Sequence, residues 1–166
     1  MTNQFQKQCF PVELELSDMN SIDKALTKLK DFEPIDVLVN NAGHSYRAAI
    51  EEGEDTRIQQ LYATNLFGPI KLIQKLLPHM REERSGAIIN ISSTAWKTHK
   101  ENVENDHQEP GDPIKAGQVI VDVIGKDNPP KTLLLGSDAV KFVDDQLTQK
   151  LKETKDWQDI SKETDF

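Results

Sequence analysis

The sequence predicts an α/β fold with a partial parallel sheet of about four strands flanked by helices. Two short apolar runs, 37–39 and 87–89, have the composition of strands that are buried on both faces. A segment with helical periodicity lies between them, from Glu54 to Leu77. Strands and helices alternate in this way in parallel α/β sheets.

The first elements lie between residues 10 and 34. Apolar and polar residues alternate over 10–16, which predicts a strand near a sheet edge. Residues 17–21 supply turn and cap residues. A short amphipathic helix follows, with apolar positions at helical spacing: Ile22, Ala25, Leu26 and Leu29. Pro34 closes this connection.

The central elements are two buried strands joined by a long helix. The run 37–39 is too apolar for a half-exposed strand, so we expect it to be buried on both faces. The helix is expected over 54–77, and Pro78 is expected to end it because proline has no backbone N–H. Its apolar positions keep helical spacing: Ile58, Leu61, Tyr62, Leu66, Ile70, Ile73 and Leu77. The second buried strand is expected over 86–93 and ends in small polar residues.

The pattern breaks down after the second strand. Between Lys97 and Pro113 the only hydrophobic residue is Val103, and such a stretch buries too little apolar surface to offset its ordering entropy. We therefore divide the chain into the central part of a domain (1–96), a polar flexible linker (97–112), a C-terminal helix–strand–helix of the same domain (113–152) and a charged tail (153–166).

The C-terminal part is expected to hold two helices and one short strand. The first helix carries apolar residues on one face: Ile114, Ala116, Val119, Ile120, Val123 and Ile124. A strand over 132–135 ends at Gly136, and Asp138 is expected to cap the last helix. That helix also has an apolar face: Val140, Val143, Leu147 and Leu151. We expect the charged tail to fray.

Composition and charge exclude several classes of protein. The chain has 166 residues, of which 36% are hydrophobic, and its formal net charge is −8. This acidity argues against nucleic acid and anionic membranes as partners, and no apolar run approaches the roughly 20 residues of a membrane helix. The start lacks a secretory signal pattern, and the single cysteine, Cys9, excludes an internal disulfide, so we expect a cytoplasmic protein. The four histidines lack ligand spacing, and no metal site is expected.

Three segments resemble the short-chain dehydrogenases/reductases. Asn40-Asn41-Ala42-Gly43, directly after a buried strand, resembles the NNAG motif of that family. Asn65 lies within the following helix, and Ser93 ends the next strand, where the family carries its active-site serine. The resemblance extends over nearly the whole chain except 97–110. It implies a partial Rossmann-like sheet and hydride transfer between NAD or NADP and a carbonyl or secondary alcohol.

The resemblance implies a role for each matched residue. Ser93 would hydrogen-bond the substrate oxygen, and Asn65 would distort its helix and anchor a proton-relay water. Gly43 would let the backbone approach a nucleotide closely. The implied cofactor contacts are Glu15, Leu16, Asn40, Ala42 and Gly43. Structural interpretations stand beside these roles, because Asn65 could simply face solvent and Ser93 could be a turn residue.

Two parts of the family's machinery have no match in the sequence. No Gly-x-Gly occurs, whereas the family cradles the cofactor pyrophosphate in a glycine-rich loop. The family's acid/base lies on a YxxxK element, but Tyr46 and Tyr62, the only tyrosines, are followed four residues later by Ile50 and Leu66. The resemblance therefore implies a truncated, internally deleted member whose cofactor binding is weak or lost and whose activity is absent or severely impaired.

Two other interpretations are consistent with the same residues. The chain could be a non-catalytic truncated product or an assembly partner of full-length relatives, or segments could be missing from the sequence as given. Family members often assemble through helices equivalent to 54–77, so the resemblance implies a homo- or hetero-oligomer through that helix. It also implies a small-molecule carbonyl or alcohol as the substrate class.

Overall fold

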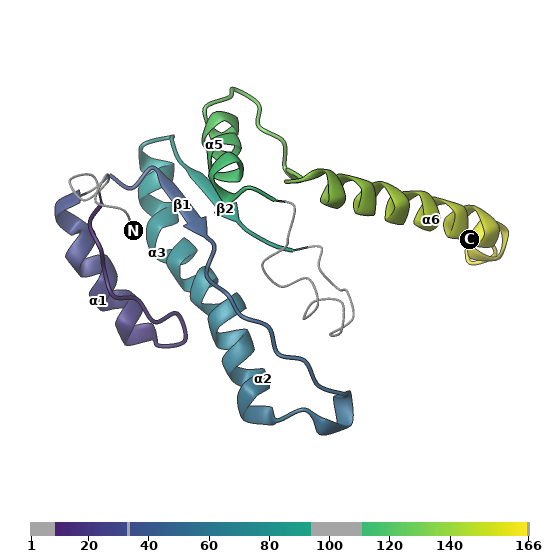
Figure 1. Ribbon diagram of the computed structural model, residues 1–166, viewed down its shortest axis with the longest axis horizontal. Coiled ribbons are helices and arrows are strands. Elements are labelled where there is room, and N and C mark those ends of the chain that lie inside the picture. The colour runs from purple at the N-terminus through teal and green to yellow at the C-terminus, as the bar shows by residue number, and fades with distance from the viewer. Residues whose placement is uncertain (1–8, 33, 94–110, 166) are drawn as a thin grey trace. The chain divides into compact units, whose positions relative to one another are not determined.

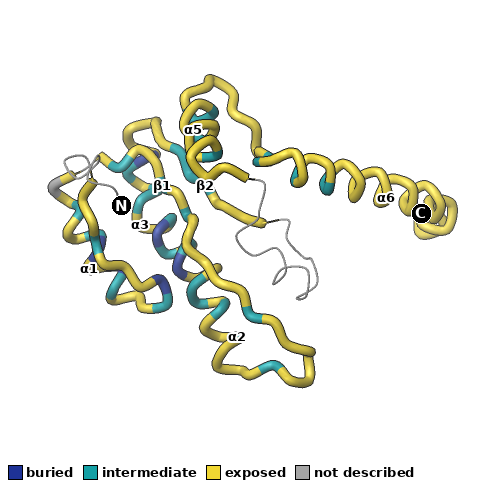
Figure 2. The backbone as a smooth tube through the Cα atoms, viewed as in Figure 1, coloured by how far each residue is buried: buried dark blue, intermediate teal, exposed yellow. Residues whose placement is uncertain are grey.

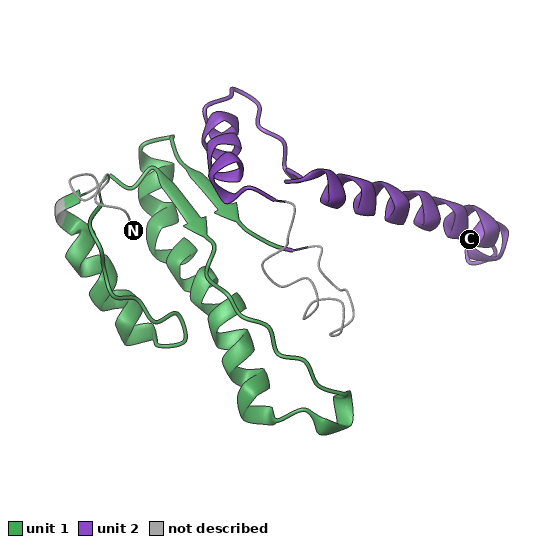
Figure 3. Ribbon diagram, viewed as in Figure 1, with its two compact units in different colours: residues 1–92 green, residues 93–166 purple. Residues whose placement is uncertain are grey.

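The chain forms two compact units, Met1–Ser92 and Ser93–Phe166 (Figure 3). The computed structural model describes residues 9–32, 34–93 and 111–165. The first unit holds a small parallel sheet with helices packed against it, and the second holds two helices (Figure 1). Among the described residues, no helix is both long enough and apolar enough to cross a membrane.

The sheet of the first unit consists of two parallel strands, β1 (Val37–Asn40) and β2 (Ala87–Asn90). Their register pairs Val37 with Ala87 and Asn40 with Asn90. The Ile91 N–H donates to the carbonyl oxygen of Asn40 at 2.9 Å, which continues the ladder past the last pair. The predicted parallel pairing is confirmed, and both strands end in asparagine at the same edge.

A helix predicted from apolar spacing, α1 (Met19–Leu29), precedes the sheet and is confirmed. The carboxylate of Asp18 caps it by accepting the N–H of Asn20 at 2.9 Å. A 3-10 turn, η2 (Lys30–Phe32), follows α1. Helix α1 packs against α3 (Gly68–Glu82), as Figure 1 shows, and an ion pair of 2.9 Å joins Asp23 to Lys75 between them.

The core of the first unit lies where α1 and α3 meet. The buried side chains Leu16, Ile22 and Leu72 form it, and Leu26 and Leu38 pack against them. Figure 2 shows the buried positions on these two helices and on the segment that leads into α1. The start of α3 approaches the backbone so closely that a Cβ added at Gly68 would lie 2.6 Å from the carbonyl oxygen of Leu16.

The long helix between the strands has three parts. A short 3-10 turn, η3 (Ile50–Glu52), precedes α2 (Asp55–Tyr62), and a π-helical turn, η4 (Ala63–Phe67), joins α2 to α3. The prediction that Pro78 ends the helix is wrong, because α3 continues through it to Glu82. The last turn buries Met80, and that packing outweighs the backbone hydrogen bond that proline cannot make.

Helix α3 ends in a tight turn that leads into β2. The Ser85 N–H donates to the carbonyl oxygen of Met80 at 3.1 Å, and Arg84 adopts a φ of 52°. Gly86 follows with a φ of 142°, and a Cβ there would lie 2.7 Å from Cγ of Met80. These positive φ angles after the end of α3 turn the chain toward β2.

The described residues contain two strands rather than the predicted four. Residues 10–16 and 132–135 adopt no strand structure. Instead of a partner strand, the Glu15 N–H finds a local acceptor, the hydroxyl oxygen of Ser21, at 2.8 Å. The expected burial of β1 on both faces is also wrong, because Val37 is 39% exposed and Val39 47% exposed. Only the face of β1 that carries Leu38 packs on the helices.

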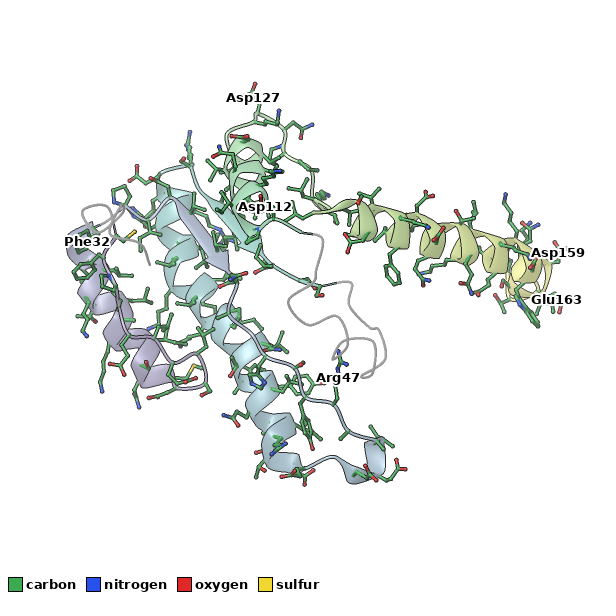
Figure 4. All side chains as sticks on the ribbon, viewed as in Figure 1. Phe32, Arg47, Asp112, Asp127, Asp159 and Glu163 are labelled. Carbon is green, nitrogen blue, oxygen red and sulfur yellow. The ribbon has the colours of Figure 1, made fainter. Side chains whose placement is uncertain are left out.

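The second unit contains α5 (Pro113–Ile124) and α6 (Ser137–Lys162). Asp112, labelled at the start of α5 in Figure 4, caps that helix by accepting the Ile114 N–H at 2.9 Å. Helix α6 begins after Gly136 and has no side-chain cap, so Asp138 lies in the first turn and is not the cap we predicted. The charged tail is helical as far as Lys162 rather than frayed. The predicted linker 97–112 lies outside the described residues except at 111–112.

Candidate functional site

The candidate site lies at the carboxyl edge of the β1–β2 sheet, where ligands bind in open α/β sheets. The side-chain amide of Asn40 donates from Nδ2 to Oδ1 of Asn90 at 2.8 Å. This bond joins the last residues of the two strands and fixes their spacing. The loop that begins at Asn41 therefore starts where the ends of the two strands are hydrogen-bonded to each other.

Asn65 clamps the loop that follows β1. Its Oδ1 accepts the backbone N–H of His44 at 3.1 Å, and its Nδ2 donates to the carbonyl oxygen of the same residue at 2.7 Å. The clamp comes from the π-helical turn η4, where the resemblance implied a distorted helix. Gly43 lies directly beneath it, since a Cβ there would be 3.3 Å from Oδ1 of Asn65. Asn65 thus makes specific backbone contacts in addition to facing solvent.

Glu15 and Leu16 lie at the end of the extended segment that leads into α1. Leu16 is buried against Gly68, while Glu15 is exposed. The Glu15 carboxylate accepts the backbone N–H of Ser17 at 2.9 Å and its hydroxyl at 2.7 Å. These two bonds lower the pKa of Glu15, and the nearby His44 lowers it further. The carboxylate is therefore ionised at neutral pH.

The remaining predicted site residues are exposed. Ala42 and Gly43 lie on the loop after β1, and both residues are exposed. Ser93 follows Asn90 by three positions and is the first residue of the second unit, whereas Asn40, Gly43 and Asn65 belong to the first. No group of three or more metal-ligating side chains occurs within 9–32, 34–93 and 111–165.

The far end of the same loop carries a cluster that the sequence did not indicate. The Glu54 N–H donates to the hydroxyl oxygen of Tyr46 at 2.9 Å. The guanidinium of Arg57 lies 5.6 Å from the centre of the Tyr46 ring, and its Nε lies 3.5 Å from Oε1 of Glu54. Asn90 was also missed, although its position at the end of a strand, like that of Asn40, was a usable signal.

Comparison with known proteins identifies relatives of the N-terminal part. A family model described as short chain dehydrogenase matches residues 1–104. An uncharacterized oxidoreductase from Schizosaccharomyces pombe is 36% identical over 86 residues, which are 51% of this chain and 36% of that protein. A fatty acyl-CoA reductase from Acinetobacter baylyi is 40% identical over 91 residues, 53% of this chain and 30% of that protein. The chain thus spans about a third of the length of these curated relatives.

Two solved structures are similar as well. A short-chain dehydrogenase from Streptomyces avermitilis superposes with a TM-score of 0.81 at 27% identity, covering 93% of this chain and 81% of that chain. A tyrosine-to-phenylalanine variant of ElxO with NADPH bound gives a TM-score of 0.51 at 31% identity, covering 55% of this chain and 38% of that chain.

Proposed function

This chain belongs to the short-chain dehydrogenase/reductase family of oxidoreductases, and we propose that the carboxyl edge of its sheet forms one wall of an NAD(P) site. The clamp of Asn65 on His44 carries the proposal, because it fixes the backbone of the loop that presents Gly43. The cofactor would accept or donate a hydride, and the substrate would be a small carbonyl compound or alcohol.

The residues present fit part of a dinucleotide. Exposed backbone at Ala42 and Gly43 follows a parallel strand, which leaves main-chain groups for contact with the nucleotide. The NADPH-bound ElxO variant supports NADPH as the probe. Glu15 would lie toward the adenine end, while Leu16 would contribute through its backbone because its side chain is buried. Since these 166 residues lack a Gly-x-Gly, we expect weak binding.

We further propose that this chain alone turns over little or no substrate. An unassisted phenol has a pKa near about 10 and is a poor base at neutral pH. Neither Tyr46 nor Tyr62 is followed by a lysine four residues later, and Tyr46 already accepts the Glu54 N–H. Ser93 would still hydrogen-bond a substrate oxygen, but no partner in these residues replaces the family's acid/base.

The test titrates the 166-residue chain with NADPH and then assays turnover with a panel of carbonyl substrates. We expect weak saturable binding that Asn65→Ala weakens at least about fivefold, since it removes two hydrogen bonds. Asn128→Ala, at an exposed position of the second unit, is the control and should leave binding unchanged. Absence of NADPH binding would overturn the site, and a kcat of about 1 s⁻¹ or more would overturn the inactivity.

A second function, assembly with another copy or with a full-length relative, is favoured by one surface. The helix from α2 to α3 exposes a row of large apolar side chains: Tyr62, Leu66, Phe67 and Ile70. Phe67, at 56% exposure, is the most exposed of them. Size-exclusion chromatography with light scattering should show a dimer, or a mixed complex with the relative, that Phe67→Ser dissociates. The control is Ile50→Ser, 96% exposed on η3, and a monomer without partners would contradict this proposal.

A further inference from the structure

The loop 41–54 connects β1 to α2 and contains only the short turn η3 as regular structure. Its first residues are held by Asn65, which bonds both backbone groups of His44. Its last residues are held by a different side chain, Tyr46, which reaches forward to the start of α2. The loop is therefore fixed at two points, and the two anchoring contacts involve positions only two residues apart, His44 and Tyr46.

The second anchor combines three contacts. The hydroxyl oxygen of Tyr46 accepts the Glu54 N–H at 2.9 Å, and Glu54 is the residue that precedes the first turn of α2. Arg57 lies over the Tyr46 ring at 5.6 Å, within range of a cation–π contact. Arg57 also pairs with Glu54 at 3.5 Å, so its guanidinium contacts both the Tyr46 ring and the Glu54 carboxylate.

We propose that Tyr46 is a positioning residue that keeps the loop in the conformation that Asn65 clamps. This inference rests on the proposed function, because the leading end of the loop, Gly43 and His44, is part of the proposed nucleotide wall. Without the second anchor, the loop would lose the contact that ties Tyr46 to the start of α2. The entropy of ordering the remaining residues would then oppose nucleotide binding.

A purely local role for Tyr46 makes a different prediction. If Tyr46 only accepts one N–H at the start of α2, its removal should speed hydrogen exchange of the Glu54 amide and leave exchange of the His44 amide unchanged. If Tyr46 positions the loop, its removal should also speed exchange of the His44 N–H, although that group donates to Asn65 and not to Tyr46. Exchange of the His44 amide therefore separates the two roles.

The experiment compares Tyr46→Phe with Tyr62→Phe by hydrogen exchange and by NADPH titration of the whole chain. Tyr46→Phe keeps the ring beside Arg57 and removes only the acceptor oxygen. We expect exchange over 43–54, including His44, to become about two- to tenfold faster. Tyr62 is 52% exposed and is the matched control, with unchanged exchange expected. NADPH affinity should fall about threefold in Tyr46→Phe and not in Tyr62→Phe.

Asn65→Ala combined with Tyr46→Phe completes the design. The losses of NADPH affinity should be less than additive, because both side chains order the same loop. Unchanged exchange at His44, or faster exchange with an unaltered NADPH affinity, would overturn the positioning role. If the unmodified chain binds no NADPH, the proposed function fails, while exchange at His44 still decides whether Tyr46 orders the loop.

Discussion

Replacing Gly68 by alanine should destabilise the first unit, although the same change stabilises most helices. Glycine within a helix costs about 0.5–1 kcal/mol relative to alanine, so a helical Gly→Ala substitution ordinarily raises stability. Gly68 begins α3 with helical backbone angles and is buried. On propensity alone, alanine would be preferred at this position.

The local packing reverses this expectation. A Cβ at Gly68 would lie 2.6 Å from the carbonyl oxygen and 2.8 Å from Cβ of Leu16. Backbone atoms cannot rotate away from such a contact, so either α3 or the segment before α1 must shift. Overpacking of this kind costs about 1–3 kcal/mol. After subtraction of the propensity gain, we expect a net loss of up to about 2.5 kcal/mol from the free energy of unfolding.

Gly117→Ala supplies the matched control, because Gly117 lies within α5 and a Cβ there would meet no atom within 4 Å. It should stabilise α5 by about 0.5–1 kcal/mol. Hydrogen exchange followed by mass spectrometry reports on α3 and α5 separately, which is needed because the two glycines lie in different units. Slower exchange in α3 after Gly68→Ala would refute the close approach of Leu16 to this helix.

Three further outcomes are expected. Arg84→Gly should raise the stability of the first unit by up to about 1 kcal/mol in urea denaturation, because Arg84 has a φ of 52°; Glu83→Gly, at a helical φ, should lower it. Asp112→Ala should cost α5 about 1 kcal/mol by removing its cap, which segment-resolved exchange would detect, and Asp112→Asn should cost little. Lys75 lowers the pKa of Asp23, so this carboxylate contributes stability above its unfolded-state pKa and loses it as pH falls through the folded-state value. Lys75→Met should return the pKa of Asp23 toward its ordinary value in an NMR titration, and an unchanged pKa would contradict the ion pair.

The elements that were predicted correctly depend on short-range patterns. Apolar spacing located α1, and continuous apolar runs located β1 and β2. The alternation over 10–16 also met the local rule for a strand, yet that segment found no partner strand. Alternation indicates that a segment can pair, whereas pairing depends on residues far away in the sequence. The prediction that the helix ends at Pro78 was wrong for a similar reason, since burial of Met80 is a tertiary effect.

In the candidate site, too, local motifs were predicted and long-range contacts were not. Asn40 and Asn65 were found because each lies in a recognisable local motif. Their partners were not found, because the path of the loop decides which backbone groups and side chains they meet. The contact of Tyr46 with Glu54 is of the same kind. A sequence pattern thus identified the donors and acceptors but not the bonds between them.

The hydrogen bonds that shape the proposed nucleotide wall, from Asn40 to Asn90 and from Asn65 to His44, all lie within the first unit. They join residues of β1, β2, the loop after β1 and the helix between the strands. Nucleotide binding should therefore survive substitutions that unfold α5 or α6.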